Sequence, residues 1–275
     1  MRPLDLLEAW SDLVGRRPSL APAIAPYGRL LEVWAGWSPD AVRPLAWDPS
    51  RLAAWSRGVP LLAEARLDVP PEASESLLGG LMEVLAALGP AEARAMQRLA
   101  EAWDGGTVAL TDLLPQVGRL GTTEVADRLG LPRAVVDLLG VATLRPILCA
   151  TFAEWHARLG VGQGDASDPG GAARLSAEAG HAWELGVCPY CGAPPGFAEV
   201  AEDGRRRLAC HVCGGMWTFA RVACPFCGHQ DSRELTQLRA EAAEEGYTVH
   251  LCRRCRGYIK ELDRRSRWNG GPALI

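Results

Sequence analysis

Residues 188–228 read CPYCGAPPGFAEVAEDGRRRLACHVCGGMWTFARVACPFCG, and residues 251–257 add LCRRCRG. Together they hold four Cys-x-x-Cys turns. Each turn directs two thiolates toward one point, whereas a tetrahedral metal ion needs four ligands. The pairs are Cys188/Cys191, Cys210/Cys213, Cys224/Cys227 and Cys252/Cys255. The sequence therefore predicts two closed four-cysteine metal sites, which use eight of the nine cysteines.

An internal repeat indicates how the pairs combine. CPYCG at 188–192 recurs as CPFCG at 224–228, and a second pair follows each copy after a gap long enough for strands. This repeat favours sequential pairing, in which the first two pairs form one site and the last two form the other. A crossed pairing stays open, because only a short segment separates Cys213 from Cys224.

The cysteines admit more than one chemistry. Four thiolates bind either zinc or iron, the ligand spacing does not distinguish the two metals, and only iron would be redox-active. Thioredoxin-like exchange fits less well, because it needs a single pair near a βαβ pattern. His211 and His229 stand beside cysteines, and we expect neither to be a ligand where four thiolates already suffice. Cys149 lies in an apolar helical stretch and is expected to be a buried small hydrophobe.

Apolar residues upstream of the cysteines recur at helical spacing, and the segment 133–159 shows the strongest pattern. Pro146 should kink or divide that helix. The predicted helices cover 4–13, 27–37, 74–88, 91–103, 111–117, 122–128, 133–159 and 174–183, and the predicted strands cover 197–201, 206–209, 216–223 and 247–251. The fold class is therefore α+β: an N-terminal all-helical domain followed by two tandem rubredoxin-like or zinc-ribbon modules with short antiparallel strands.

The predicted domains follow one another along the chain. They are a helical domain at 1–160, a linker with a lead-in helix at 161–186, a first four-cysteine ribbon at 187–223, a second at 224–262, and a flexible tail at 263–275. The ribbons have few large apolar residues, so metal binding should supply much of their folding free energy.

Composition narrows the class of protein. The net charge of −4 is mild, and acidic residues such as Asp5 and Glu8 interrupt the N-terminus, which is unlike a secretory signal. We find no run of 18 uncharged apolar residues and therefore expect no membrane span, and without a secretory signal we expect the chain to stay inside the cell. In that compartment, paired cysteines bind metal more often than they form disulfides.

The sequence shows no P-loop, no GxGxxG and no recognisable Ser/His/Asp set, so we do not expect an enzyme.

The residues between the cysteines add specificity to this generic framework. Pro194-Pro195, Arg207-Leu208, Trp217, Arg221-Val222, Tyr258 and Lys260 stand at fixed offsets from the pairs. With these residues, the region resembles the FdhE family of formate dehydrogenase accessory proteins over about 75 positions. Lys260, the only lysine of the chain, falls at the lysine position of that family. Met216 departs from the family pattern, which often has an acidic residue there.

The resemblance implies a cytoplasmic maturation factor that binds the catalytic subunit of formate dehydrogenase through a metal-bearing, rubredoxin-like region. It also suggests a partner surface formed by Trp217, Arg221, Tyr258 and Lys260, although Trp217 and Tyr258 would equally serve to pack over the ribbons. The oligomeric state stays open.

Two other functions remain as alternatives. A nucleic-acid-binding zinc ribbon would use the basic runs at 205–207 and 253–256, but the acidic helical half argues against a nucleic-acid partner. A rubredoxin-type electron carrier would not need a large helical domain.

Overall fold

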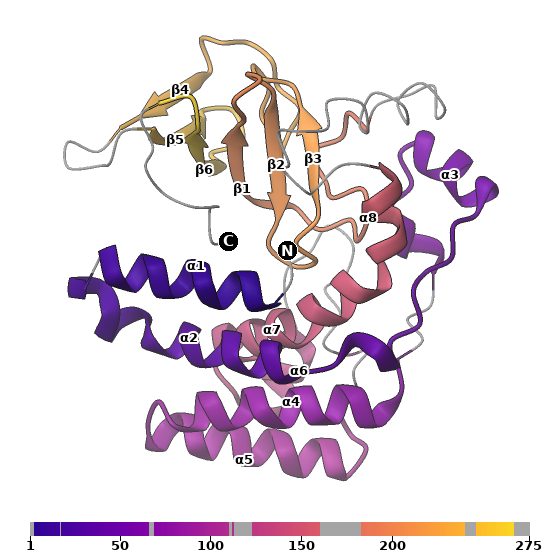
Figure 1. The fold of residues 1–275 in the computed structure, drawn as a ribbon, viewed down its shortest axis with the longest axis vertical. Helices are drawn as coiled ribbons and strands as arrows, with labels where there is room; N and C mark the ends of the chain where they lie inside the picture. Colours follow the sequence, from indigo (N-terminus) through magenta and orange to yellow (C-terminus); the bar gives the residue numbers. More distant parts are fainter. Residues whose placement is uncertain are drawn as a thin grey trace. The chain divides into compact units, whose positions relative to one another are not determined.

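The computed structural model describes residues 3–16, 18–65, 69–109, 112, 123–159, 183–239 and 246–266 (Figure 1). The chain forms two compact units. The helical unit combines residues 1–43 with 67–150, and the cysteine unit combines residues 44–66 with 151–273. The predicted helix at 111–117, except Asp112, and the predicted helix at 174–183, except Trp183, lie outside the described residues.

The helical unit contains long amphipathic helices, as the sequence periodicity predicts. They are α1 (Pro3–Arg16), α2 (Ala21–Gly36), α4 (Pro71–Ala86), α5 (Pro90–Asp104), α6 (Thr123–Leu129) and α7 (Arg133–Thr151), with short 3₁₀ turns η1 (Pro18–Leu20) and η2 (Pro39–Ala41). Pro71 and Pro90 open their helices, a position where the missing N–H has no helical partner to lose. Leu81, Leu99 and Leu139 are completely buried in the shared apolar core.

Pro146 does not divide α7, so the prediction of a break at this proline is wrong. The helix runs on to Thr151, and a turn at Phe152 separates it from α8 (Ala153–Leu159). Proline has no N–H to donate to the carbonyl four residues earlier, which here belongs to Ala142. The Trp34 indole N–H donates to that carbonyl instead, at 2.9 Å. A tertiary hydrogen bond therefore satisfies the group that the proline leaves open.

Replacing Trp34 by phenylalanine should destabilise the helical unit by about 1–3 kcal/mol, because the buried Ala142 carbonyl loses this donor. The free energy of unfolding from urea titrations measures the effect. Pro146→Ala in the Trp34→Phe background restores a backbone N–H and should recover part of the loss. No recovery in the double variant would contradict this account.

The helix α7 is long and apolar enough, by length and composition alone, to cross a membrane. Half of its most apolar window is buried within the protein, as in the core helix of many globular domains. Cys149 on this helix is exposed, so the prediction of a buried cysteine is wrong. Its neighbours Ile147 and Leu148 occupy the buried side of the helix, and the helical repeat turns position 149 outward.

The cysteine unit contains one six-stranded sheet in the order β3-β2-β1-β6-β5-β4 (Figure 1). Its strands are β1 (Pro195–Val200), β2 (Arg206–Cys210), β3 (Met216–Phe219), β4 (Leu235–Leu238), β5 (Tyr247–Cys252) and β6 (Tyr258–Asp263). Within each ribbon the strands are antiparallel, as predicted. The parallel pairing of β1 with β6, in which Ala198 faces Glu261, was not predicted, and it joins the two ribbons into one sheet.

Part of the N-terminal half belongs to the cysteine unit rather than to the helical unit. Here α3 (Pro49–Ser56) and η3 (Leu61–Glu64) lie in the cysteine unit together with α8. The Trp47 and Trp155 rings have centroids 4.4 Å apart, and the Leu45 N–H donates to the Thr151 carbonyl at 2.7 Å. The predicted division of the chain into successive domains stays a prediction. The Trp47–Trp155 and Leu45–Thr151 contacts join residues that are far apart in the sequence.

Candidate metal centres

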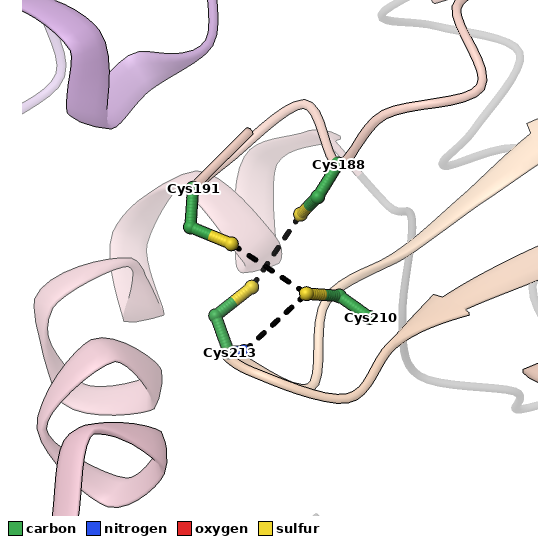
Figure 2. Close-up of side chains that lie close together, drawn as sticks. All are labelled: Cys188, Cys191, Cys210 and Cys213. Atoms are coloured by element: carbon green, nitrogen blue, oxygen red, sulfur yellow. Dashed lines mark hydrogen bonds between the residues drawn. The ribbon is translucent and has the colours of Figure 1, made fainter. Parts of the chain in front are cut away.

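The first four-cysteine group lies where two tight turns meet beside the strands of the first ribbon. Figure 2 shows the four side chains pointing toward one another. The Sγ atoms of Cys188 and Cys213 are 3.5 Å apart, as are those of Cys191 and Cys210. Each turn closes through a glycine with positive φ, Gly192 in one and Gly214 in the other, a conformation that side chains disfavour.

The geometry of the first centre fits a metal ion. A metal–sulfur bond of about 2.3 Å in a tetrahedron places the sulfurs roughly 3.8 Å from one another, and a disulfide would bring them to about 2.05 Å. The observed 3.5 Å lies near the metal value. Burial raises the pKa of the Cys188 and Cys213 thiols well above the ordinary value, so a cation is needed to hold these buried groups as thiolates. This donor set suits zinc or iron.

The surroundings seal the first centre from water. All four of its cysteines are at most 2% exposed, and Tyr190 between them is completely buried. The Tyr190 ring packs against Phe152 and against the edge of His156, with centroids 5.7 Å and 4.2 Å away. The η3 turn adds backbone hydrogen bonds, including one from the Leu62 N–H to the Tyr190 carbonyl at 2.8 Å. Burial lowers the pKa of His156 to about 4, so its imidazole is neutral at physiological pH.

The second four-cysteine group has the same construction but a different exposure. The Sγ atoms of Cys224 and Cys255 are 3.6 Å apart, and those of Cys227 and Cys252 are 3.8 Å apart. Cys224 and Cys252 are buried, whereas Cys227 and Cys255 are exposed. One sealed centre and one open centre therefore lie in the same sheet unit. The sequential pairing of the cysteines is confirmed, and the crossed pairing is wrong.

The predicted partner residues do not form one surface. Trp217 is 1% exposed and donates its indole N–H to the Leu185 carbonyl at 3.0 Å, so its ring packs inside the unit. Tyr258 and Lys260 are both exposed and share one face of β6. Arg221 lies at the opposite face, because it lines a hollow together with Ile259, whose side chain alternates with theirs.

The histidines beside the cysteines stay outside both four-cysteine groups, as predicted. The His229 Nδ1 atom lies 3.2 Å from an Arg254 guanidinium nitrogen. His229 also closes its turn through the main chain, because its carbonyl accepts from the Cys224 N–H at 2.8 Å.

A buried charged group that the sequence did not predict connects the two ribbons. The Arg206 Nε atom of β2 lies 2.6 Å from the Glu261 carboxylate of β6, and both side chains are at most 6% exposed. The His250 Nε2 atom of β5 lies 3.0 Å from the other Glu261 oxygen. Arg206 also donates to the Ala223 carbonyl at 3.0 Å, directly before the second centre. Burial tends to raise the pKa of Glu261, but His250 and Arg206 outweigh it and the pKa lies below its ordinary value.

Known proteins are similar to this chain both in sequence and in fold. No protein-family model matches it. An FdhE homologue of Stutzerimonas stutzeri is 32% identical over 80 residues, which is 28% of this chain and 26% of that protein. An FdhE homologue of Pseudomonas putida is 28% identical over 139 residues, or 48% of this chain and 37% of that protein. The matches thus span well under two thirds of these relatives' length.

The fold comparison covers nearly the whole chain. The crystal structure of the FdhE protein from Pseudomonas aeruginosa matches with a TM-score of 0.52 and 22% identity, over 95% of this chain and 79% of that one. It shares the α+β architecture predicted from the sequence. Repeated sequence matches to FdhE homologues, together with the fold of an FdhE protein, support the resemblance to the FdhE family.

Proposed function

We propose that this protein is a cytoplasmic accessory factor for the maturation of formate dehydrogenase, and not itself an enzyme. Its two four-cysteine groups each hold one zinc or iron ion, and the region around them binds the catalytic subunit of the dehydrogenase. The observation that carries the proposal is the pair of metal-fitting cysteine centres on an FdhE fold. Metal bound in the first centre stabilises the sheet, because its ligands come from two separate turns that the ion would tie together.

The candidate residues for contact with the partner are Arg221, Tyr258 and Lys260, and all three are exposed. Because Arg221 lies on the other face from Tyr258 and Lys260, they represent two surfaces that can be tested separately. Trp217 is buried, and its indole N–H donates to the Leu185 carbonyl, so its role is in packing within the cysteine unit.

Purified anaerobically, the protein should contain two metal ions per chain, measured by mass spectrometry together with an optical spectrum. Two irons per chain, with ferric-thiolate absorption that bleaches on reduction, would indicate a redox role for the centres. Two zincs per chain would indicate a structural role. Fewer than one metal per chain after anaerobic purification would contradict the proposed centres.

The role in maturation has its own test. Deleting the gene should abolish formate dehydrogenase activity while the catalytic subunit is still synthesised, and tagged protein should co-purify with that subunit. Normal dehydrogenase activity in the deletion strain would overturn the proposed function.

A further inference from the structure

A hollow of about 220 Å³ lies beside the second cysteine centre. Its lining includes Val222, Phe226, Leu235 of β4 and Ile259 of β6. Cys224 and Cys252 line it as well, so an occupant would lie directly against the open centre.

The size of the hollow indicates what kind of group it can hold. Sites for small molecules and cofactors usually enclose about 300–1,000 Å³, which is larger than the 220 Å³ here. The space suits one or two side chains of a peptide. The hollow extends across neighbouring positions of three strands, Gln237 of β4, His250 of β5 and Ile259 of β6, so it suits an extended segment that lies across the sheet.

The lining is apolar at its rim. Val222 is 53% exposed and Phe226 is 41% exposed. These two side chains present apolar surface beside the hollow that an incoming apolar group could cover. One apolar side chain of the incoming segment would therefore pack between them.

The charged residues that line the hollow are basic: Arg206 and Arg221, with His250 beside them. Glu261 already lies against Arg206 at 2.6 Å.

Arg221 is exposed, and its guanidinium donates to the Gly204 carbonyl at 3.3 Å. Arg265 is the direct partner of the Asp263 carboxylate and lowers its pKa, to which the charge of Arg221 also contributes, so Arg221 has further N–H groups for an acceptor. No carboxylate lines the hollow among the described residues. The charge thus favours an anionic group next to the apolar one.

We propose that this hollow binds an extended peptide segment in which an apolar side chain stands next to an aspartate or glutamate. The carboxylate pairs with Arg221 and the apolar side chain packs between Val222 and Phe226. This inference rests on the proposed function, in which the partner is the catalytic subunit of formate dehydrogenase. It specifies the kind of segment on that subunit that the hollow recognises. Docking there brings the segment against the second centre and away from the sealed first centre.

The test uses the metal-loaded full chain and two readouts. The first is fluorescence anisotropy with a panel of synthetic extended peptides that combine leucine or phenylalanine with aspartate, and with matched peptides in which asparagine replaces aspartate. The second is co-purification of the whole catalytic subunit. Arg221→Glu and Val222→Asp change exposed side chains, and Arg94→Glu makes the same charge reversal on the exposed side of α5 as a control.

Arg221→Glu should weaken binding of the acidic peptides at least about tenfold, because it replaces an attractive charge pair with a repulsive one. Arg94→Glu should bind the acidic peptides as the wild type does. The asparagine peptides should bind wild type and Arg221→Glu equally. Equal binding by wild type and Arg221→Glu would overturn the hollow as the site, even if the subunit still co-purifies. Binding of acidic peptides without co-purification of the subunit would support the hollow and overturn the proposed partner. Absence of any acidic-peptide binding by the metal-loaded protein would overturn the inference itself.

Discussion

Replacing Cys210 by serine should unfold the cysteine unit while the helical unit keeps its structure. Cys210 ends β2 and supplies one of four sulfurs to the sealed centre. Structural zinc in small cysteine sites contributes about 10–16 kcal/mol at neutral pH, which is as large as the whole stability of an ordinary domain, about 5–15 kcal/mol. A serine oxygen is a poor substitute for the thiolate, so most of this contribution is lost. Far-UV circular dichroism, metal content and limited proteolysis measure the outcome.

The open centre provides the matched comparison. Cys255→Ser removes one exposed sulfur from the second group, and we expect the variant to lose one metal ion but to retain the sealed centre and the first ribbon. Proteolytic cleavage should then fall in the second ribbon. If Cys210→Ser remained folded with two metal ions, the structural role of the first centre would be wrong.

Replacing Arg206 by methionine should destabilise the cysteine unit by about 3–5 kcal/mol, because it leaves the Glu261 carboxylate buried without its closest positive charge. The Ala223 carbonyl also loses the donor that holds the segment before the second centre. Urea unfolding of the metal-loaded protein measures the loss, and metal retention at the second centre reports whether that segment has moved.

Two further variants distinguish the effect of leaving a buried carboxylate unpaired from the effect of removing an arginine side chain. In Arg206→Met with Glu261→Leu, both charges are gone, and an apolar pair of this kind often restores most of the stability. Arg233→Met removes an arginine whose carboxylate partner, Asp231, lies at the surface, where such a pair contributes about 0–1 kcal/mol. A loss below about 1 kcal/mol in Arg206→Met would show that Glu261 is adequately held by His250 alone.

Local sequence predicted much of this fold. The cysteine groups followed from spacing, because each Cys-x-x-Cys turn is set by a few consecutive residues and the CPYCG/CPFCG repeat indicates which turns belong together. Apolar periodicity located most of the described helices but not α3, and Gly89-Pro90 marked the break between α4 and α5.

The parts that were missed depend on residues far apart in the chain. No strand was predicted for YIKELD at 258–263, yet β6 lies inside the sheet, where Arg206 pairs with the buried Glu261. Neither residue carries a local sign of this pairing. Similarly, no helix was predicted at 49–56, where α3 lies, and no local pattern indicates that Trp55 packs against Trp183, with centroids 5.5 Å apart.

The parallel pairing of β1 with β6 has a consequence for the order of events during synthesis. Arg264 follows β6 and pairs with Glu199 of β1 from 65 residues later in the chain. A growing chain therefore carries the first ribbon with one edge of β1 bare until the last strand emerges, and bare edges are sites of mispairing with other chains. The first centre draws all its ligands from residues made before the second ribbon, so an ion captured there holds the ribbon together while the ribosome completes the strand that covers it.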